Sequence, residues 1–197
     1  ARWAPRVLVP AAARAPAWRR RASSAAEGLR FTGTHEWLRS EEDGHVAVLG
    51  LSHHAQGLLG EVFWIDLPKV GDRFKREQPI ASLEGMRLPA EGVQQAEDSE
   101  DEGPGAAGEY SGRGWNVSEV TVGRLGNMYT VEREVFAPAD CEVLEANHRL
   151  KGERELVNAS AEADGWLLKL RLLSEAPALL DAAAYRALCA QEAGDAE

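Results

Sequence analysis

The sequence predicts a mainly β protein, a small barrel or sandwich of short strands that ends in one helix. Two observations carry this prediction. Residues 31–83 and 131–170 contain short apolar runs with a period near two, separated by Gly and Pro turns, which is typical of packed antiparallel sheets. Residues 177–189, by contrast, have helical spacing of Ala, Leu and Tyr over a longer run. With 197 residues and 44% hydrophobic content, we expect one compact domain with appendages.

The first strands and turns follow in chain order. Runs at 31–38 and 45–50 flank the acidic turn 41–44, which predicts a hairpin. Ser52 can accept a backbone N–H and Gly60 can end a helix, so the residues between them predict a short helix. Further strands are expected at 61–67, 73–75, 80–83, 134–138, 141–147 and 165–170. In the final helix, Ser174 is the expected cap and Pro177 the expected first-turn residue.

The N-terminal segment 1–26 differs from the rest in charge. It contains six arginines, many alanines and no acidic residue. This composition is typical of mitochondrial targeting segments, and it predicts import to the matrix; a basic disordered arm is the alternative. We therefore assign residues 27–190 to the domain and residues 191–197 to a flexible tail.

Overall charge and cysteine content exclude several classes. The net charge of −10 argues against nucleic acid and anionic membranes as partners. No apolar run approaches the length that spans a bilayer. Cys141 and Cys189 are too few for a disulfide framework and lack metal-ligand spacing, so we expect reduced thiols. We also expect a monomer.

The middle segment 88–130 fits neither half. An acidic run at 97–102 precedes a Gly- and Pro-rich run at 103–108, and together they offer little apolar surface to offset the entropy of ordering. Residues 115–128 alternate weakly, which we attribute to chance. We predict a disordered, low-complexity insertion that acts as a solvated tether.

A series of short strings, in order and mostly at matching spacing, resembles the glycine cleavage system H protein family. They are Phe31-Thr32, His35-Glu36-Trp37, His54-Ala55-Gln56, Leu59-Gly60-Glu61-Val62, Leu67-Pro68, Val70-Gly71, Leu83-Glu84, Glu142-Val143, Asn147, Leu156-Val157-Asn158 and Asp164-Gly165-Trp166-Leu167.

The resemblance implies a barrel-sandwich hybrid, the lipoyl-domain-like fold, with a C-terminal helix. It implies a carrier and not an enzyme, in which a tight hairpin displays lipoyl-lysine. The lipoate arm takes an aminomethyl group from the pyridoxal-phosphate glycine decarboxylase (P protein) to the folate-dependent aminomethyltransferase (T protein). Dihydrolipoamide dehydrogenase (L protein) then reoxidises it. The cleft for the loaded arm maps by resemblance to Thr34, Glu36 and Glu134.

The attachment position departs from the family. Around its lysine the family pattern resembles Glu-Ser-Val-Lys-Ala-x-Ser-Glu-x-x-x-Pro. Read forward from Glu84 the lysine slot holds Arg87, and read backward from Pro138 it holds Thr130. A guanidinium stays protonated and is a poor nucleophile, so we expect that lipoate cannot be attached at Arg87. About 43 residues are extra here, since 54 steps replace the family's eleven.

Three interpretations of this departure stay open. A retained or misplaced coding segment has displaced the lysine of a working H protein. Alternatively, the chain is a non-lipoylated homologue that keeps the fold and binds the same partners. Last, the arm has moved to another lysine, although Lys69, Lys75, Lys151 and Lys169 match scaffold positions.

Other polar residues are weaker candidates. His35, His53 and His54 suggest a metal, but adjacent histidines point to different sides of an element and no neighbouring cysteine or acid completes a set. We therefore expect structural histidines and no metal. For Glu36, a general acid or base and an ordinary solvated carboxylate are the alternatives to its arm-cleft role.

Overall fold

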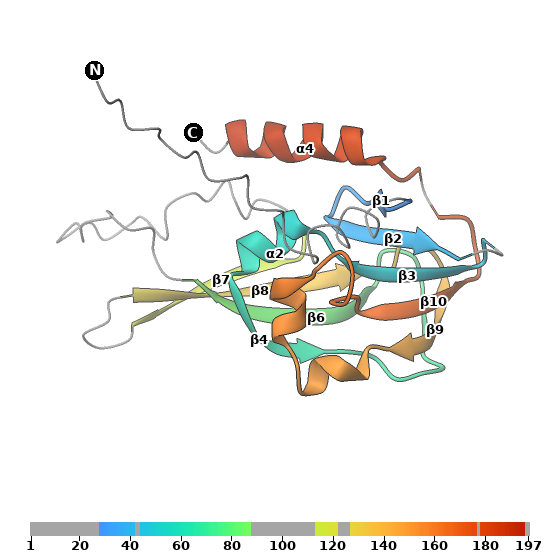
Figure 1. Cartoon of the computed structure of the whole chain (residues 1–197), viewed down its shortest axis with the longest axis horizontal. Coiled ribbons are helices and arrows are strands. Elements are labelled where there is room, and N and C mark those ends of the chain that lie inside the picture. Colours follow the sequence, from blue (N-terminus) through green and yellow to red (C-terminus); the bar gives the residue numbers. More distant parts are fainter. Residues whose placement is uncertain (1–27, 42–43, 88–112, 122–126, 177, 196–197) are drawn as a thin grey trace, which may run out of the picture.

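Two antiparallel sheets form the domain in the computed structural model, which describes residues 28–41, 44–87, 113–121, 127–176 and 178–195 (Figure 1). The first sheet has the strand order β1-β2-β3-β10-β9-β5, and the second has the order β4-β6-β8-β7. Neither sheet closes into a barrel. The predicted mainly β fold with a C-terminal helix is confirmed.

The elements have the following bounds. The first sheet contains β1 (Arg30–Phe31), β2 (Glu36–Ser40), β3 (Val46–Leu51), β10 (Leu168–Leu172), β9 (Cys141–Ala146) and β5 (Arg73–Phe74). The second sheet contains β4 (Glu61–Asp66), β6 (Pro79–Arg87), β8 (Asn127–Phe136) and β7 (Trp115–Thr121). The helices are α2 (His53–Leu59), η2 (His148–Lys151), α3 (Glu155–Ala159) and α4 (Ala182–Asp195).

Most local predictions for the first half are confirmed, although the run 31–38 divides into β1, a turn and β2. β2 and β3 form the expected hairpin, with Trp37 opposite Gly50. The side chain of Ser52 accepts from the Ala55 N–H at the start of α2. Gly60 ends α2 at φ +76°, a backbone conformation that favours glycine.

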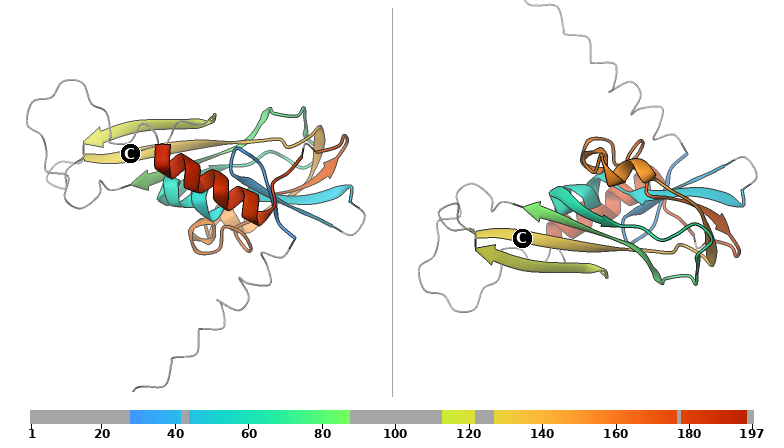
Figure 2. Two further views of the ribbon diagram at one scale, coloured as in Figure 1. Left: turned by 90° about the horizontal axis from the view of Figure 1, so that it is seen from above. Right: turned by 90° about the horizontal axis from the view of Figure 1, so that it is seen from below.

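The main core lies between the two sheets. Alternate residues of the strands face inward, among them Leu49, Leu170 and Val143 from the first sheet and Leu83 and Val131 from the second. A smaller cluster lies on the outer side of the first sheet, where α4 covers β1, β2 and β3 (Figures 1 and 2). It contains Leu29, Phe31, Trp37, Val48 and Tyr185.

The second sheet contradicts part of the predicted disorder at 88–130. β6 and β8 pair along their length, from Pro79 opposite Phe136 to Arg87 opposite Tyr129, and β7 adds to the far edge of β8. Residues 115–121 and 127–130 are therefore strand, because their weak alternation places Trp115 and Val117 against the core. Residues 88–112 and 122–126 lie outside the described part.

The C-terminal helix also differs from its prediction. Asp181 caps it, accepting from the N–H groups of Ala183 and Ala184, so α4 begins five residues after Pro177. Ser174 instead accepts from the Asp140 N–H. α4 runs to Asp195, so most of the expected tail 191–197 is helical. The predicted targeting segment 1–26 lies outside the described residues and stays a prediction.

Side-chain amides hold the segment between β9 and β10. Asn147 donates to the carbonyls of Asp164 and Trp166, at 3.0 and 2.8 Å. Asn158 ties α3 to the second sheet, accepting from the Val62 N–H and donating to the Gly60 carbonyl. None of the helices in the described part of the chain combines the length and apolar content of a membrane span.

Candidate functional site

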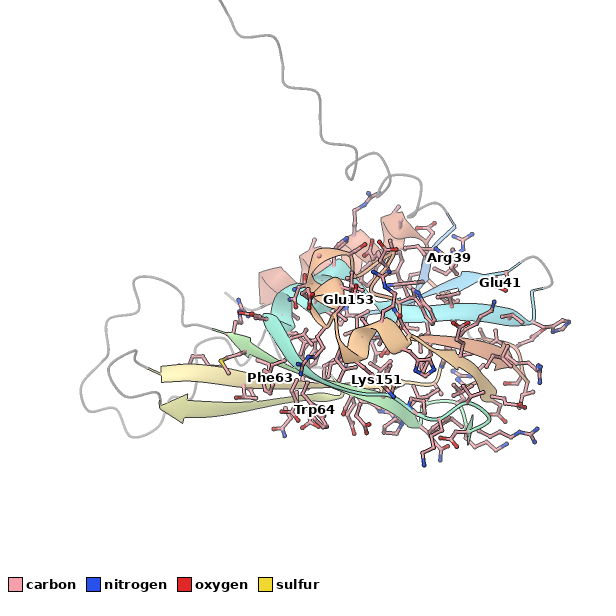
Figure 3. All side chains as sticks on the ribbon, turned by 60° about the horizontal axis from the view of Figure 1, so that its bottom comes forward. Arg39, Glu41, Phe63, Trp64, Lys151 and Glu153 are labelled. Carbon is pink, nitrogen blue, oxygen red and sulfur yellow. The ribbon has the colours of Figure 1, made fainter. Side chains whose placement is uncertain are left out.

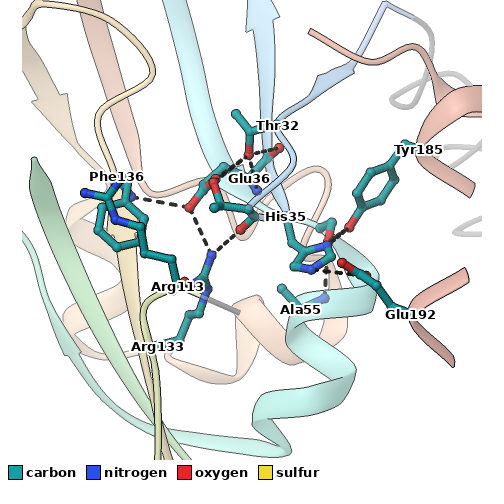
Figure 4. A network of polar contacts seen from close by, with 11 residues as sticks. Thr32, His35, Glu36, Ala55, Arg113, Arg133, Phe136, Tyr185 and Glu192 are labelled. Carbon is teal, nitrogen blue, oxygen red and sulfur yellow. Dashed lines mark hydrogen bonds and ion pairs between the residues drawn. The ribbon is translucent and has the colours of Figure 1, made fainter. Parts of the chain in front are cut away.

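The carboxylate of Glu36 is the centre of a buried polar cluster between the two sheets (Figure 4). The hydroxyl groups of Thr32 and Thr34 donate to its Oε2, the latter at 2.6 Å. Its Oε1 accepts from the Phe136 N–H at 3.3 Å. The structure thus brings together the predicted cleft residues Thr34 and Glu36.

Arg133 completes this cluster. Its guanidinium lies 3.2 Å from Glu36 Oε1, and both side chains are almost fully buried. It also donates to the carbonyls of Thr34 and Arg113 and stacks 4.8 Å from the Trp115 ring. Sequence reasoning missed Arg133, although counting back from Pro138 puts it where the family pattern has serine.

Glu36 and Arg133 of this cluster form an internal ion pair supported by hydrogen bonds. Burial raises the pKa of the Glu36 carboxyl, and the charge of Arg133 and the bonds from Thr32, Thr34 and Phe136 oppose that rise. Burial lowers the pKa of Arg133, and Glu36 opposes it. Arg133 Nε is buried and has no hydrogen-bond partner within the described part of the chain. A buried pair of this kind is costly to break from one side, because the remaining charge stays buried.

Glu134, the third predicted cleft residue, does not join the cluster. It follows Arg133 on β8, so the alternation of the strand turns it to the opposite face of the second sheet. There it lies across from Ser82, while Glu132 lies across from Glu84.

The outer face of the second sheet is acidic. In register, Trp64, Glu84 and Glu132 form one row across three strands, with half-exposed Trp64 on the edge strand β4 (Figure 3). The neighbouring rows carry Asp66 and Glu134 on one side, and Glu61 and exposed Met86 on the other. None of these paired positions holds a lysine or arginine. We name these residues the acidic face: Glu61, Trp64, Asp66, Glu84, Met86, Glu132 and Glu134.

The two possible lysine slots lie beside each other in the sheet. Thr130 pairs with Met86, and Arg87 pairs with Tyr129. Both readings of the family pattern therefore lead to the same end of the β6–β8 ladder, one residue apart. Thr130 lies within the β6–β8 ladder, and Arg87 is the last residue of β6.

Close packing of α2 against β6 fixes the orientation of this end. A Cβ on Gly85 would lie 2.2 Å from the Leu59 carbonyl oxygen. A Cβ on Gly60 would lie 2.4 Å from the Met86 oxygen and 3.3 Å from Arg87 Cγ. Arg87 therefore lies on the side of the sheet that faces α2, opposite to Met86.

The three histidines that the sequence suggests as metal ligands separate into two groups. The structure brings His35 and His54 close to Cys189 and Glu192 of α4, and the possible ligand atoms of these four lie within 4.8 Å of one another. His53 turns away, and its Nε2 lies 4.0 Å from Glu162. Burial lowers the pKa of His35 to about 4, with the charges of His54 and Arg133 adding to the effect.

Comparison with known proteins identifies relatives along most of the chain. Residues 29–97 and 119–192 match the family described as "Glycine cleavage H-protein". The glycine cleavage system H protein of Thermotoga maritima is 30% identical over 165 residues, 83% of this chain and 97% of the relative. That of Alteromonas mediterranea is 33% identical over 159 residues, 80% of this chain and 89% of the relative. The crystal structure of such a protein from Mycobacterium marinum has a TM-score of 0.51 at 15% identity, covering 85% of this chain and 95% of its own, which supports the fold alone.

Proposed function

Because the chain belongs to the glycine cleavage H-protein family, we propose that it takes the H-protein place in the glycine cleavage system. In this proposal it is a non-catalytic docking subunit that carries no lipoate at residue 87. Its partners are the glycine decarboxylase, the aminomethyltransferase and dihydrolipoamide dehydrogenase. Residues 1–26 direct it to the mitochondrial matrix.

The observation that carries the proposal is the chemistry of the attachment position. Lipoylation makes an amide to a lysine amine, and the slot holds Arg87 in one reading and Thr130 in the other. A guanidinium does not lose its proton at any physiological pH, so it offers no nucleophile.

The buried pair of Glu36 and Arg133 supports the same conclusion. In the family the corresponding glutamate receives the loaded arm. Here Arg133 already neutralises that carboxylate at 3.2 Å and is fully buried beside it. A methylamine-loaded arm would have to displace this guanidinium, which leaves a charge unpaired in the interior.

The acidic face is the surface that we propose for docking. Its carboxylates match a basic partner surface, and charge complementarity of this kind raises association rates and selects partners. Trp64 and Met86 lie exposed within the acidic face. Tryptophan is one of the side chains that supply most of the binding energy of protein interfaces.

Competition for the glycine decarboxylase tests the proposal. The purified, unmodified chain should reduce the decarboxylase reaction of a lipoylated H protein by competing for its docking surface. The charge reversal Glu84→Lys with Glu132→Lys should weaken that competition at least about tenfold, and added salt should weaken competition by the parent chain.

A matched control reverses a charge elsewhere. Glu175 is exposed in the segment after β10 and is not part of the acidic face, so Glu175→Lys should compete as the parent does. The absence of competition by the folded chain at high concentration would overturn the docking role. Equal loss in Glu175→Lys would overturn the choice of surface.

A second function, the lipoate carrier, is favoured by one feature of the ladder. Removing residues 88–130 and changing Arg87→Lys joins Lys to Val131 and restores the family's eleven steps between Glu84 and Pro138. The strands on both sides are already paired next to that junction. A transcript that lacks the segment and encodes this lysine would make the same gene product a carrier, and sequencing transcripts across the junction tests this.

A further inference from the structure

Four potential metal ligands meet where α4 crosses the domain. They come from three elements: the turn before β2, the first turn of α2 and one face of α4. We name them the α4 cluster: His35, His54, Cys189 and Glu192. Cys189 and Glu192 are three residues apart, so both side chains lie on one side of the helix. The cluster has no role in the proposed docking function.

All the possible ligand atoms of the α4 cluster lie within 4.8 Å of one another, and the two shortest printed separations match a tetrahedral site. Glu192 Oε2 lies 3.4 Å from His35 Nε2 and 3.8 Å from His54 Nε2. Both separations exceed the usual N–H···O distance of about 2.7 to 3.2 Å. Tetrahedral ligands at about 2.0 to 2.3 Å from a zinc ion lie about 3.3 to 3.8 Å from one another.

The same Glu192 oxygen adds a second observation. The side chain is 38% exposed, but this oxygen is itself buried and has no hydrogen-bond partner within the described part of the chain. Buried carboxylate oxygens are normally hydrogen-bonded, and one that is not requires an explanation such as a bound ion. It is directed at the two imidazoles, as Figure 4 shows for His35.

The surroundings of His35 hold its ring in the orientation that a ligand needs. Its Nδ1 lies 2.9 Å from the Tyr185 hydroxyl, which lies 2.6 Å from Ser52 Oγ. An Nδ1–H that donates to Tyr185 leaves the Nε2 lone pair facing the cluster. Metal-ligating histidines usually have such a partner on their second nitrogen. The His35 backbone, at φ +67°, is a further sign of a constrained position.

We propose that the α4 cluster binds one Zn²⁺ ion, which fastens α4 to the turn before β2 and to α2. Two imidazoles, a thiolate and a carboxylate are a donor set that zinc accepts in tetrahedral geometry. Two negative ligands balance the charge of the ion, so the bound site is neutral. Binding forms the Zn–S bond and releases the Cys189 thiol proton to solvent.

Zinc would supply stability that α4 obtains only partly from packing. The contact of α4 with the domain rests on Tyr185, which stacks on Phe31 with ring centroids 4.2 Å apart, and on the partly buried Leu188 and Cys189. Alanines and exposed polar residues make up much of the rest of the helix. His35 also adjoins Glu36, so the same ion would steady the turn that carries Thr34.

Titration with zinc alone tests the proposal. The full chain, without a purification tag and treated with a chelator, is titrated with ZnCl₂ against a chromophoric zinc chelator. We expect one ion per chain and a higher melting temperature when it is bound. Cys189→Ser and His54→Ala should each weaken zinc binding at least about 100-fold. Losing even a group that only hydrogen-bonds a metal ligand lowers metal affinity about 10- to 100-fold.

Two further variants separate coordination from folding. His53→Ala removes the neighbouring histidine outside the α4 cluster and should bind zinc as the parent does. Tyr185→Phe keeps the ring on Phe31 but removes the partner of His35, and it should bind about tenfold more weakly. With Co²⁺ in place of zinc, the parent should show tetrahedral absorption and a thiolate-to-cobalt band that Cys189→Ser lacks.

Two results would overturn the proposal. One is zinc affinity in Cys189→Ser, confirmed as folded by circular dichroism, equal to that of the parent. The other is a dependence on His53 as strong as that on His54, which would assign binding to surface histidines. Neither readout involves lipoate or a partner enzyme, so failure here leaves the proposed docking function standing.

Discussion

Replacing Arg133 by serine, the residue of the family pattern, should destabilise the fold because it leaves Glu36 buried without its cation. Removing one partner of a buried ion pair typically costs about 3 to 5 kcal/mol. Glu36 can limit that cost by taking up a proton. A carboxyl whose ordinary pKa is 4.5 costs about 3.4 kcal/mol to protonate at pH 7 and about 0.7 kcal/mol at pH 5. We therefore expect a loss of about 3 kcal/mol at pH 7.

The sign of the pH dependence follows from the same reasoning. In Arg133→Ser the folded state holds a proton on Glu36 that the unfolded chain releases above its ordinary pKa. The folded state therefore binds more protons in that range, and the variant gains stability as the pH falls from 7 toward 5. The difference from the parent should shrink to about 1 kcal/mol at pH 5.

Urea unfolding at the two pH values measures this difference. Arg113→Ser is the matched control, because Arg113 also stacks on Phe136 but is exposed. It should change stability by less than about 0.5 kcal/mol. A loss below about 1 kcal/mol at pH 7 for Arg133→Ser, or a loss independent of pH, would refute the buried-pair reasoning.

Three more predictions concern the close approach of α2 to β6 and the caps of α2 and α4. Gly85→Ala puts a Cβ 2.2 Å from the Leu59 oxygen and should cost about 1 to 3 kcal/mol of stability in thermal unfolding. Gly57→Ala, which lies within α2 and has open space around it, should instead stabilise the fold by about 0.5 to 1 kcal/mol. Equal effects of the two substitutions would contradict the close approach of α2 to β6. Ser52→Ala removes the α2 cap and the partner of Tyr185, and should cost about 2 kcal/mol in urea unfolding; a neutral result would contradict the role of the cap. Hydrogen bonds from the Ala184 and Ala183 N–H groups lower the pKa of Asp181 below its ordinary 3.8. The cap of α4 is therefore intact above pH 3.8 and is lost as the pH falls through the lowered pKa. The NMR amide shifts of Ala183 and Ala184 should follow this titration, and Asp181→Asn should abolish the titration.

Much of the scaffold is predictable from local sequence. The alternation at 45–50 and 141–147 predicts strands that the structure contains, and Ser52 and Gly60 bracket α2 because capping chemistry is local. The start of α4 was misplaced because Ser174 and Asp181 are both plausible caps, and tertiary contacts decide between them. β7 was missed because its few apolar residues matter only once β8 lies beside it.

The functional residues divide in the same way. Thr34 and Glu36 could be found because the resemblance marks them, and they lie two residues apart. Arg133 could not, since an arginine in a strand predicts exposure and only the distant Glu36 makes its burial possible. The α4 cluster was likewise invisible, because His35 and His54 are separated from Cys189 and Glu192 by most of the chain.

Intact mass after co-expression with a lipoylating system tests the central claim most directly. The positive control is the variant that lacks residues 88–130 and carries Arg87→Lys, which should gain the mass of one lipoyl group. The parent chain, with Arg87 in the slot, should gain none. A lipoyl adduct on the parent chain, on any residue, would contradict the account.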